Sequence, residues 1–275
     1  PKAIEEQIKN FAGANEAEKA LALWVAYLQM GETEKATAAF GEAKRLNPDH
    51  VMIVSRDFDD ALDKKDMPGA LALAEKAKAL NLDKAGGAIF RARYEAENGR
   101  LPEAIAVVQQ AAEKDPLNPL AWRVLGRLRL DAQRYADAVA AMEKAVAIKP
   151  DDVESVIGLA QAKVMVGSPM EALKVCRDTA AMGAGTPEFV NLWLDLEMQY
   201  GDVAQALDRR KRMFETMPTD RANSTRYLAL LLNKGDYPGA KAVMDAIEAQ
   251  GNADDIQPYR AMWHAAQKQD DQARE

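Results

Sequence analysis

Alanine recurs every 34 residues along almost the whole chain. Seven alanines form one unbroken series with that step, at Ala36, Ala70, Ala104, Ala138, Ala172, Ala206 and Ala240. Because the step never changes, no insertion or deletion separates neighbouring copies. A fixed period of this length is the signature of a repeat architecture, in which each copy packs against its neighbours. We therefore interpret the 275 residues as one repeat array and not as two ordinary globular domains.

Other columns of the repeat predict a helix, a turn and a second helix in each copy. Five residues before the series alanine, most copies carry glycine, which readily adopts the left-handed conformation that ends a helix. Four copies then carry a proline where the second helix should begin, a position that suits a residue without an N–H group. These prolines are Pro68, Pro102, Pro169 and Pro238. The repeats thus start at residues 17, 51, 85, 119, 153, 187, 221 and 255.

The fourth copy carries the fullest version of a known pattern. Its members are Trp122, Leu125, Gly126, Ala138, Met142, Ala145 and Pro150. A 34-residue helix–turn–helix with Trp-x2-Leu-Gly, then Ala-x3-Phe, then Pro resembles the tetratricopeptide repeat. The resemblance covers about residues 17–275. It implies an all-α fold, a right-handed α–α superhelical solenoid of helix–turn–helix repeats, in a multi-repeat array of the bacterial type.

The repeat columns divide the chain into three segments. Residues 1–16 predict a short helix, with Ile4, Ile8 and Phe11 at helical spacing, that is either a cap or the end of a preceding repeat. Residues 17–254 hold seven 34-residue repeats. Residues 255–275 hold the first helix of an eighth repeat, around Pro258 to Gln267, followed by residues typical of a second helix. We expect residue 275 to fall inside a hairpin, and the apolar face left there to allow self-association.

Some copies depart from the pattern in columns that should be apolar. Asp57 and Arg91 stand where leucine is expected, and Arg210 stands where a large apolar residue is expected. We expect the second, third and sixth hairpins to pack less well for this reason. The basic run 209–212, which includes Arg210, is interpreted as the solvated face of a helix, because nucleic-acid patches usually extend over about five to eight residues.

Composition argues against several classes of function. A net charge of −7 disfavours a nucleic-acid partner. The longest apolar run, Ala20 to Leu28, is shorter than the about 20 residues that cross a bilayer, so we expect no membrane insertion. The single Cys176 excludes an intrachain disulfide and a cysteine metal cluster, and we expect it to be a buried structural thiol. His50 and His264 stand in the first and eighth copies, too far apart to share a metal.

The sequence holds no recognisable catalytic constellation. Its carboxylates are spread along predicted helix surfaces at spacings that pair with Lys and Arg, and no Gly-x4-Gly-Lys-Ser/Thr phosphate loop occurs. We expect no catalytic residue, no metal and no cofactor, and so no enzyme activity. The resemblance implies a non-catalytic scaffold that binds a peptide or a partner surface in a concave groove. The alternative is a positioning or regulatory segment of a larger bacterial enzyme or envelope-export protein. The chain begins with Pro-Lys-Ala-Ile and shows no signal-peptide pattern, which leaves cytoplasm and periplasm open.

The resemblance also implies which residues face the groove, namely the second, fifth, ninth and twelfth of each repeat. The candidate ligand-binding residues on this surface are Arg93, Arg123, Arg127, Gln161, Asn191, Tyr259 and Trp263. Arg123 and Arg127 are four residues apart and share a helix face, and Arg93 holds the position of Arg127 one repeat earlier. We hypothesise that the three arginines hold an acidic or C-terminal peptide, because a guanidinium captures a carboxylate with two hydrogen bonds.

A simpler explanation for two of these arginines is ion pairing on their own helices. Glu97 follows Arg93 by four residues, and Asp131 follows Arg127 by four. Pairs at this spacing lie side by side on a helix surface and contribute only about 0–1 kcal/mol. The sequence leaves both interpretations open.

Overall fold

The computed structural model of the chain describes residues 6, 8, 13–82, 85, 87–183, 185–251 and 253–274. It divides into two compact units, residues 1–148 and 149–275, which we call the N-terminal part and the C-terminal part. The regular elements of the described residues are all helices, without a strand, which confirms the predicted all-α class. The short helix expected around Ile4 and Phe11 lies outside the described residues.

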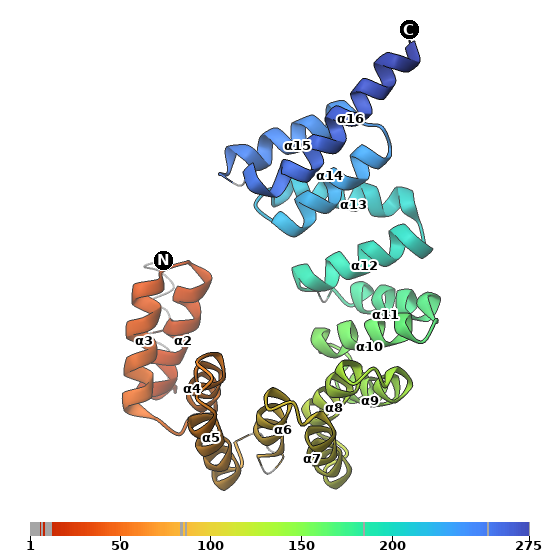
Figure 1. The fold of residues 1–275 in the computed structure, drawn as a ribbon. Coiled ribbons are helices and arrows are strands. Elements are labelled where there is room, and N and C mark those ends of the chain that lie inside the picture. Colours follow the sequence, from red (N-terminus) through yellow and green to blue (C-terminus); the bar gives the residue numbers. More distant parts are fainter. Residues whose placement is uncertain are drawn as a thin grey trace. The chain divides into compact units, whose positions relative to one another are not determined.

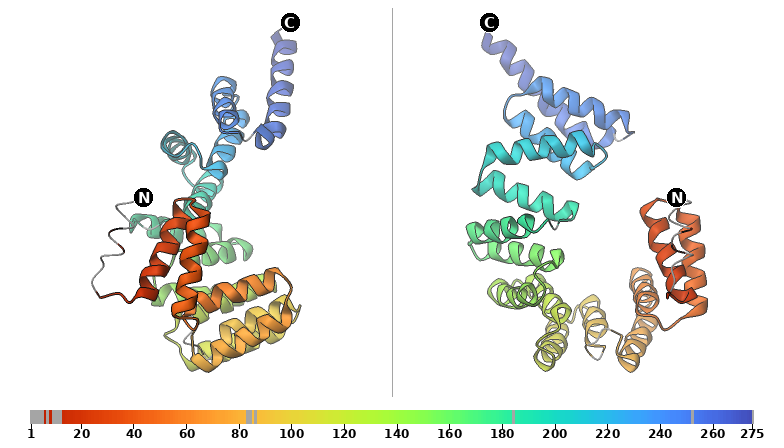
Figure 2. Two further views of the ribbon diagram at one scale, coloured as in Figure 1. Left: turned by 90° about the vertical axis from the view of Figure 1, so that its left-hand side faces the viewer. Right: turned by 180° about the vertical axis from the view of Figure 1, so that it is seen from behind.

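The N-terminal part consists of helix hairpins that follow the predicted repeats (Figure 1). The two helices of each hairpin contact each other, and each hairpin contacts the next along the chain. The helices are α2 (Glu16–Gln29), α3 (Thr33–Leu46), α4 (Val51–Asp63), α5 (Met67–Leu80), α6 (Ala88–Glu97), α7 (Leu101–Lys114), α8 (Pro119–Asp131) and α9 (Tyr135–Ile148). Figure 2 shows the α2–α3 hairpin, in red and orange, from two further directions.

The C-terminal part continues with three further hairpins in its described residues, and these hairpins also contact one another in chain order. The helices are α10 (Val153–Met165), α11 (Pro169–Ala181), α12 (Pro187–Tyr200), α13 (Val203–Thr216), α14 (Arg221–Asn233) and α15 (Tyr237–Ala249). A 3-10 turn, η1 (Ala253–Ile256), leads into α16 (Gln257–Arg274), which contacts α14 and α15.

The end of the array differs from the prediction. The sequence predicts that the first helix of the eighth repeat ends near Gln267 and that a second helix follows. The structure instead has a single helix, α16, that runs unbroken to Arg274. No glycine or proline follows Pro258, so the chain lacks the residue that ends the first helix in most other repeats. Ala261, Met262 and Ala265 of this helix are exposed.

The turn inside each hairpin has the geometry that the glycine column predicts, with one exception. The residue at this column is left-handed in six repeats, even where it is Lys65 (φ 56°) or Gln133 (φ 58°). Gly201 instead has φ −127°, and α12 extends one residue further than the first helices of the other six hairpins. A Cβ atom at Gly201 would lie 2.1 Å from Oε2 of Glu197, so this glycine allows the Glu197 carboxylate to lie close to the backbone.

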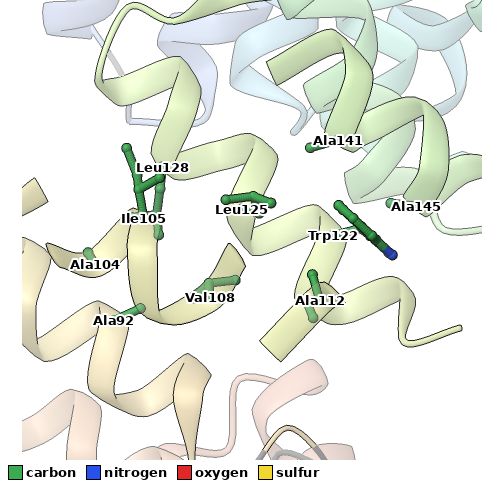
Figure 3. Close-up of a cluster of buried hydrophobic side chains, with 11 residues drawn as sticks. Ala92, Ala104, Ile105, Val108, Ala112, Trp122, Leu125, Leu128, Ala141 and Ala145 are labelled. Atoms are coloured by element: carbon green, nitrogen blue, oxygen red, sulfur yellow. The ribbon is translucent and has the colours of Figure 1, made fainter. Parts of the chain in front are cut away.

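The core combines the small side chains of the alanine series with larger apolar side chains. The seven alanines of the 34-residue series are each no more than 2% exposed. Around α6 to α9, Ile105, Val108, Trp122 and Leu125 form the centre of a buried cluster (Figure 3). Full burial of a side chain of this size is worth roughly 1.5–3 kcal/mol. The hydrophobic contacts between successive hairpins therefore supply much of the stability of the stack.

Polar residues in apolar columns have partners of opposite charge. Asp57 accepts a hydrogen bond from Nζ of Lys44 in the preceding repeat, at 2.7 Å. Arg91 pairs with Glu95 on its own helix, at 2.6 Å. The structure thus accommodates these departures by ion pairing, and it buries the third one, Arg210, completely.

Candidate functional site

The three predicted arginines lie on two first helices of the N-terminal part. Arg93 belongs to α6, Arg123 and Arg127 belong to α8, and these helices contact each other. Arg93 and Arg127 are exposed, and Arg123 is half-buried. We call this set, Arg93, Arg123 and Arg127, the arginine face. It places three cationic side chains on neighbouring helices, as the 34-residue period predicts.

Arg93 is held by the preceding repeat. Its Nη2 atom lies 2.6 Å from Oδ1 of Asp59, the residue one repeat earlier in the same column. Its guanidinium carbon lies 5.2 Å from the ring centroid of Phe58, which is fully buried. The sequence suggested Glu97 as the partner, and in the described residues the partner is Asp59. Arg93 therefore links α4 to α6 and leaves part of its guanidinium in solvent.

Arg127 makes the ion pair that its own helix predicts. Its Nε atom lies 3.5 Å from Oδ1 of Asp131, and both side chains are at least half exposed. An exposed pair of this kind contributes only about 0–1 kcal/mol. A ligand carboxylate can therefore compete for Arg127 at little cost.

The other predicted site residues belong to the C-terminal part, and only Gln161 on α10 is exposed there. Asn191 on α12 is 4% exposed and accepts a hydrogen bond from Arg210. Tyr259 and Trp263 on α16 pack against the buried cluster of α14 and α15. Trp263 also donates its indole N–H to the carbonyl of Tyr237, at 3.1 Å. Asn191 is thus part of the core, whereas Tyr259 and Trp263 are half-buried and contact that core with part of their rings.

Arg210 lies at the centre of a buried polar network, which we call the Arg210 network. Nη1 donates to the side-chain oxygens of Asn191 (3.0 Å) and Asn223 (3.2 Å). Nη2 donates to the carbonyl of Asn191 (3.2 Å) and to Oδ1 of Asp195 (2.6 Å). The other oxygen of Asp195 accepts from Nε of Arg226, at 3.0 Å. The network joins α12, α13 and α14, and so connects the sixth repeat to the seventh.

The network corrects the interpretation of the basic run as a wholly solvated face. Arg210 is 0% exposed, and burial lowers its pKa while the Asp195 carboxylate opposes that effect. The sequence did contain a signal, because Asn191 and Asn223 also stand in columns that are mostly apolar or small in other repeats. Three polar residues in core columns of adjacent helices indicate a shared hydrogen-bond network, since buried polar groups need partners.

Glu197 forms a second buried network, between α11 and α12. Its carboxylate accepts two hydrogen bonds from Arg177, both 2.7 Å, and one from the indole N–H of Trp193, at 3.0 Å. The backbone N–H of Asp202 donates a fourth, at 3.1 Å. The Arg177 hydrogen bonds lower the pKa of Glu197 to about 2 against the opposing effect of burial. Burial and the Glu197 charge raise the pKa of Cys176 to about 12, and this thiol is buried as expected.

The Glu197 network predicts a specific dependence of stability on pH. Because the folded pKa lies below the unfolded value, the network stabilises the fold above about pH 4.5, and this contribution is lost as the pH falls towards 2. Glu197→Gln should therefore destabilise the protein at pH 7 by about 1–3 kcal/mol, the cost of losing a charged partner in a buried pair. Thermal unfolding by circular dichroism should show a gap between wild type and variant that narrows as the pH falls from 4.5 towards 2. A gap that stays constant would contradict the role of the Glu197 charge.

A cleft of about 640 Å³ lies between α5, α6 and α7. Its lining includes Ala74, in a column that holds larger side chains in the other repeats, so the missing bulk helps to open the cleft. Three of its charged lining residues are already paired, since Arg91 contacts Glu75 (3.3 Å) and Glu95 (2.6 Å). Its remaining charged residues include both signs, Lys78 and Lys114 with Glu103, so the cleft has no evident preference for a charged ligand.

Two other kinds of site are absent from the described part of the chain. It contains no group of three or more His, Cys, Asp or Glu side chains that could hold a metal ion. None of its helices is both long enough and apolar enough to cross a membrane.

Comparison with known families decides what kind of array this is. Three family models described as tetratricopeptide repeat match residues 25–50, 91–153 and 129–192. The chain is a tetratricopeptide-repeat protein. The match over residues 91–153 includes most of α6 and the whole of α8, the helices of the arginine face.

Solved structures share the fold of this tetratricopeptide-repeat protein at low sequence identity. The Cut9–Hcn1 hetero-tetramer of APC/C aligns with a TM-score of 0.64 and 11% identity, over 97% of this chain and 53% of that one. PilW, a type IV pilus biogenesis factor, aligns with a TM-score of 0.53 and 16% identity, over 77% of this chain and 99% of the PilW chain. YrrB, a tetratricopeptide-repeat protein with an unusual peptide-binding site, aligns with a TM-score of 0.50 and 20% identity, over 71% of this chain and 97% of the YrrB chain.

Buried charge recurs at one column of this tetratricopeptide-repeat protein. The eleventh residue of the third to sixth repeats is charged and is buried or half-buried: Glu95, Arg129, Lys163 and Glu197. Each has a polar partner, for example Glu171 for Lys163, at 2.7 Å. Removing one member of a buried pair is costly because the other charge remains without compensation. Glu95, Lys163 and Glu197 have partners of opposite charge, whereas Arg129 donates to the carbonyl of Asp137 and to the side chain of Gln109.

Proposed function

We propose that this tetratricopeptide-repeat protein is a non-catalytic protein-interaction scaffold that binds an acidic peptide segment on the arginine face. The observation that carries the proposal is the position of Arg93, Arg123 and Arg127 on the contacting helices α6 and α8. The peptide-binding site named for YrrB supports it, because that protein shares the repeat fold.

The chemistry of the arginine face fits a carboxylate ligand. A guanidinium offers planar, paired N–H donors that match the two oxygens of a carboxylate. Asp59 and Phe58 hold Arg93 in one position, which lowers the entropy that binding would cost. The rest of the chain carries a net negative charge, so a local group of cations is a distinct feature that an acidic segment can recognise.

The proposal is tested with a fluorescein-labelled octaglutamate peptide and fluorescence anisotropy. Arg123→Ala combined with Arg127→Ala should weaken binding at least about tenfold, the loss expected from one or two charge-assisted hydrogen bonds. Arg45→Ala combined with Arg134→Ala is the matched control, because it removes the same charge from other exposed positions. Binding should also weaken as salt increases, because exposed charges are screened.

The control and the melting curve decide the result. An equal loss of affinity in both double variants would show only non-specific attraction and would reject the arginine face. Retained affinity in the Arg123 and Arg127 double variant, with an unchanged melting temperature, would reject it as well.

A further inference from the structure

The C-terminal part contains a second hollow, between α12 and α13, with a volume of about 610 Å³. We call it the α12–α13 pocket. Its apolar lining is Val190, Trp193 and Leu194 from α12 and Met213 from α13. Its polar lining is Gln205, Asp208, Arg209 and Arg212, and both arginines belong to the basic run noted in the sequence. The pocket thus combines apolar side chains with charged ones.

Arg209 is stacked on a fixed aromatic ring. Its guanidinium carbon lies 4.6 Å from the ring centroid of Trp193, which is 8% exposed. The indole is held in turn, because its N–H donates to Glu197 at 3.0 Å and Arg177 binds that carboxylate with two hydrogen bonds. A guanidinium held over an indole gains a cation–π interaction and loses little further freedom when it binds a ligand.

The hydrogen-bond donors of Arg209 remain available at this position. Its neighbours in the basic run are paired, Arg212 with Asp208 at 2.7 Å and Lys211 with Glu215 at 3.9 Å. Within the described residues, the contact of Arg209 is the one with Trp193, and its side chain is exposed. Stacking uses the face of the guanidinium and leaves the N–H groups at its edge, which suit a carboxylate.

We infer that the α12–α13 pocket docks an acidic, apolar segment of a partner protein. A Glu or Asp side chain of the segment binds the edge of Arg209, and an adjacent apolar side chain packs on Val190 and Met213. Charge complementarity argues for this occupant over a phosphate-rich one, because Arg212 is paired with Asp208 and the single charge of Arg209 matches one carboxylate. The site differs from the arginine face and does not depend on it.

The test uses the indole N–H signals in nitrogen-15 NMR spectra of the full chain, which has four tryptophans. The signal of Trp193 is assigned from a Trp193→Phe variant. The probe is an acetylated and amidated peptide, Gly-Ser-Leu-Glu-Leu-Glu-Ser-Gly, with a matched peptide in which Gln replaces Glu. We expect the Glu peptide to shift the Trp193 signal saturably and the Gln peptide to bind at least about tenfold more weakly.

Variants separate the role of the stacked guanidinium from general charge. Arg209→Ala should weaken binding at least about tenfold, and Arg209→Lys should show an intermediate loss, because lysine keeps the charge without the planar donors. The control Lys211→Ala removes one charge from the same run outside the pocket lining and should bind like wild type. The Arg123 and Arg127 double variant should also leave the Trp193 shift unchanged, which separates this site from the arginine face.

Four outcomes would overturn the inference. The first is equal binding of the Glu and Gln peptides. The second is wild-type affinity in Arg209→Ala with an unchanged melting curve. The third and fourth are a Trp193 shift caused by inorganic phosphate or by phosphatidylserine–phosphatidylcholine vesicles but not by the Glu peptide. Those last results would indicate a free-anion or membrane site instead.

Discussion

Arg210→Ala is expected to destabilise the C-terminal part by about 3–5 kcal/mol, the combined cost of leaving buried polar groups without their donor and of opening a cavity. The side chain is fully buried and holds Asn191, Asn223 and Asp195 together. Its removal leaves two buried amides without their donor and creates a cavity as well. Amide hydrogen exchange should therefore speed up in α12, α13 and α14, and the urea midpoint of unfolding should fall.

A triple variant distinguishes the loss of the charge from the loss of the shape. Arg210→Met, Asn191→Ile and Asn223→Ala together introduce residues that other repeats carry in the same columns. Replacement of a whole buried polar network by apolar residues is often neutral or stabilising, so the triple variant should recover most of the loss. If Arg210→Ala leaves hydrogen exchange in α12 to α14 unchanged, the network does not join the sixth and seventh repeats as described.

Gly87→Ala is the second change with a large expected effect, about 2–5 kcal/mol from backbone strain and overpacking together. Gly87 has φ +74°, and a Cβ atom there would lie 2.5 Å from Cα and 2.7 Å from N of Lys78. Those atoms belong to the backbone of α5, so no change of side-chain rotamer relieves the overlap. The start of α6 must then move away from α5.

Gly99→Ala is the matched control for this position. Gly99 has nearly the same φ, +73°, but nothing lies within 4 Å of a Cβ atom built there. Gly99→Ala should therefore lower the free energy of unfolding by only about 1–2 kcal/mol, the cost of a Cβ atom in the left-handed conformation. Urea unfolding of both variants gives the difference directly. Equal losses would show that the close approach of α5 and α6 at Gly87 contributes nothing.

The sequence predicted the elements well because their signals are local. The glycine column and the prolines at 68, 102, 169 and 238 mark helix ends, and the structure places each of these prolines in the first two residues of a second helix. The prediction was wrong at α16, where no glycine or proline ends the first helix. Helix ends depend on a few neighbouring residues, so a short window is enough to predict them.

The candidate site was predicted less completely. The pair Arg127–Asp131 follows from spacing on one helix, and the structure contains it. The pair Arg93–Asp59 joins two repeats, so helix spacing alone did not indicate it. Asn191 shares a column with buried or half-buried residues in other repeats, and its partner Arg210 comes from α13, so spacing on α12 alone did not indicate the contact.

The 34-residue period by itself determined the hairpins, their order and the alanines at their contacts, because each depends on residues within one repeat. Only the tertiary structure decided which polar residues are buried. Arg210 and Glu197 each bind groups from two or three helices, and some of those groups come from a neighbouring repeat. A charge enters a core only where such partners offset its loss of hydration, and those partners meet only after the hairpins have stacked.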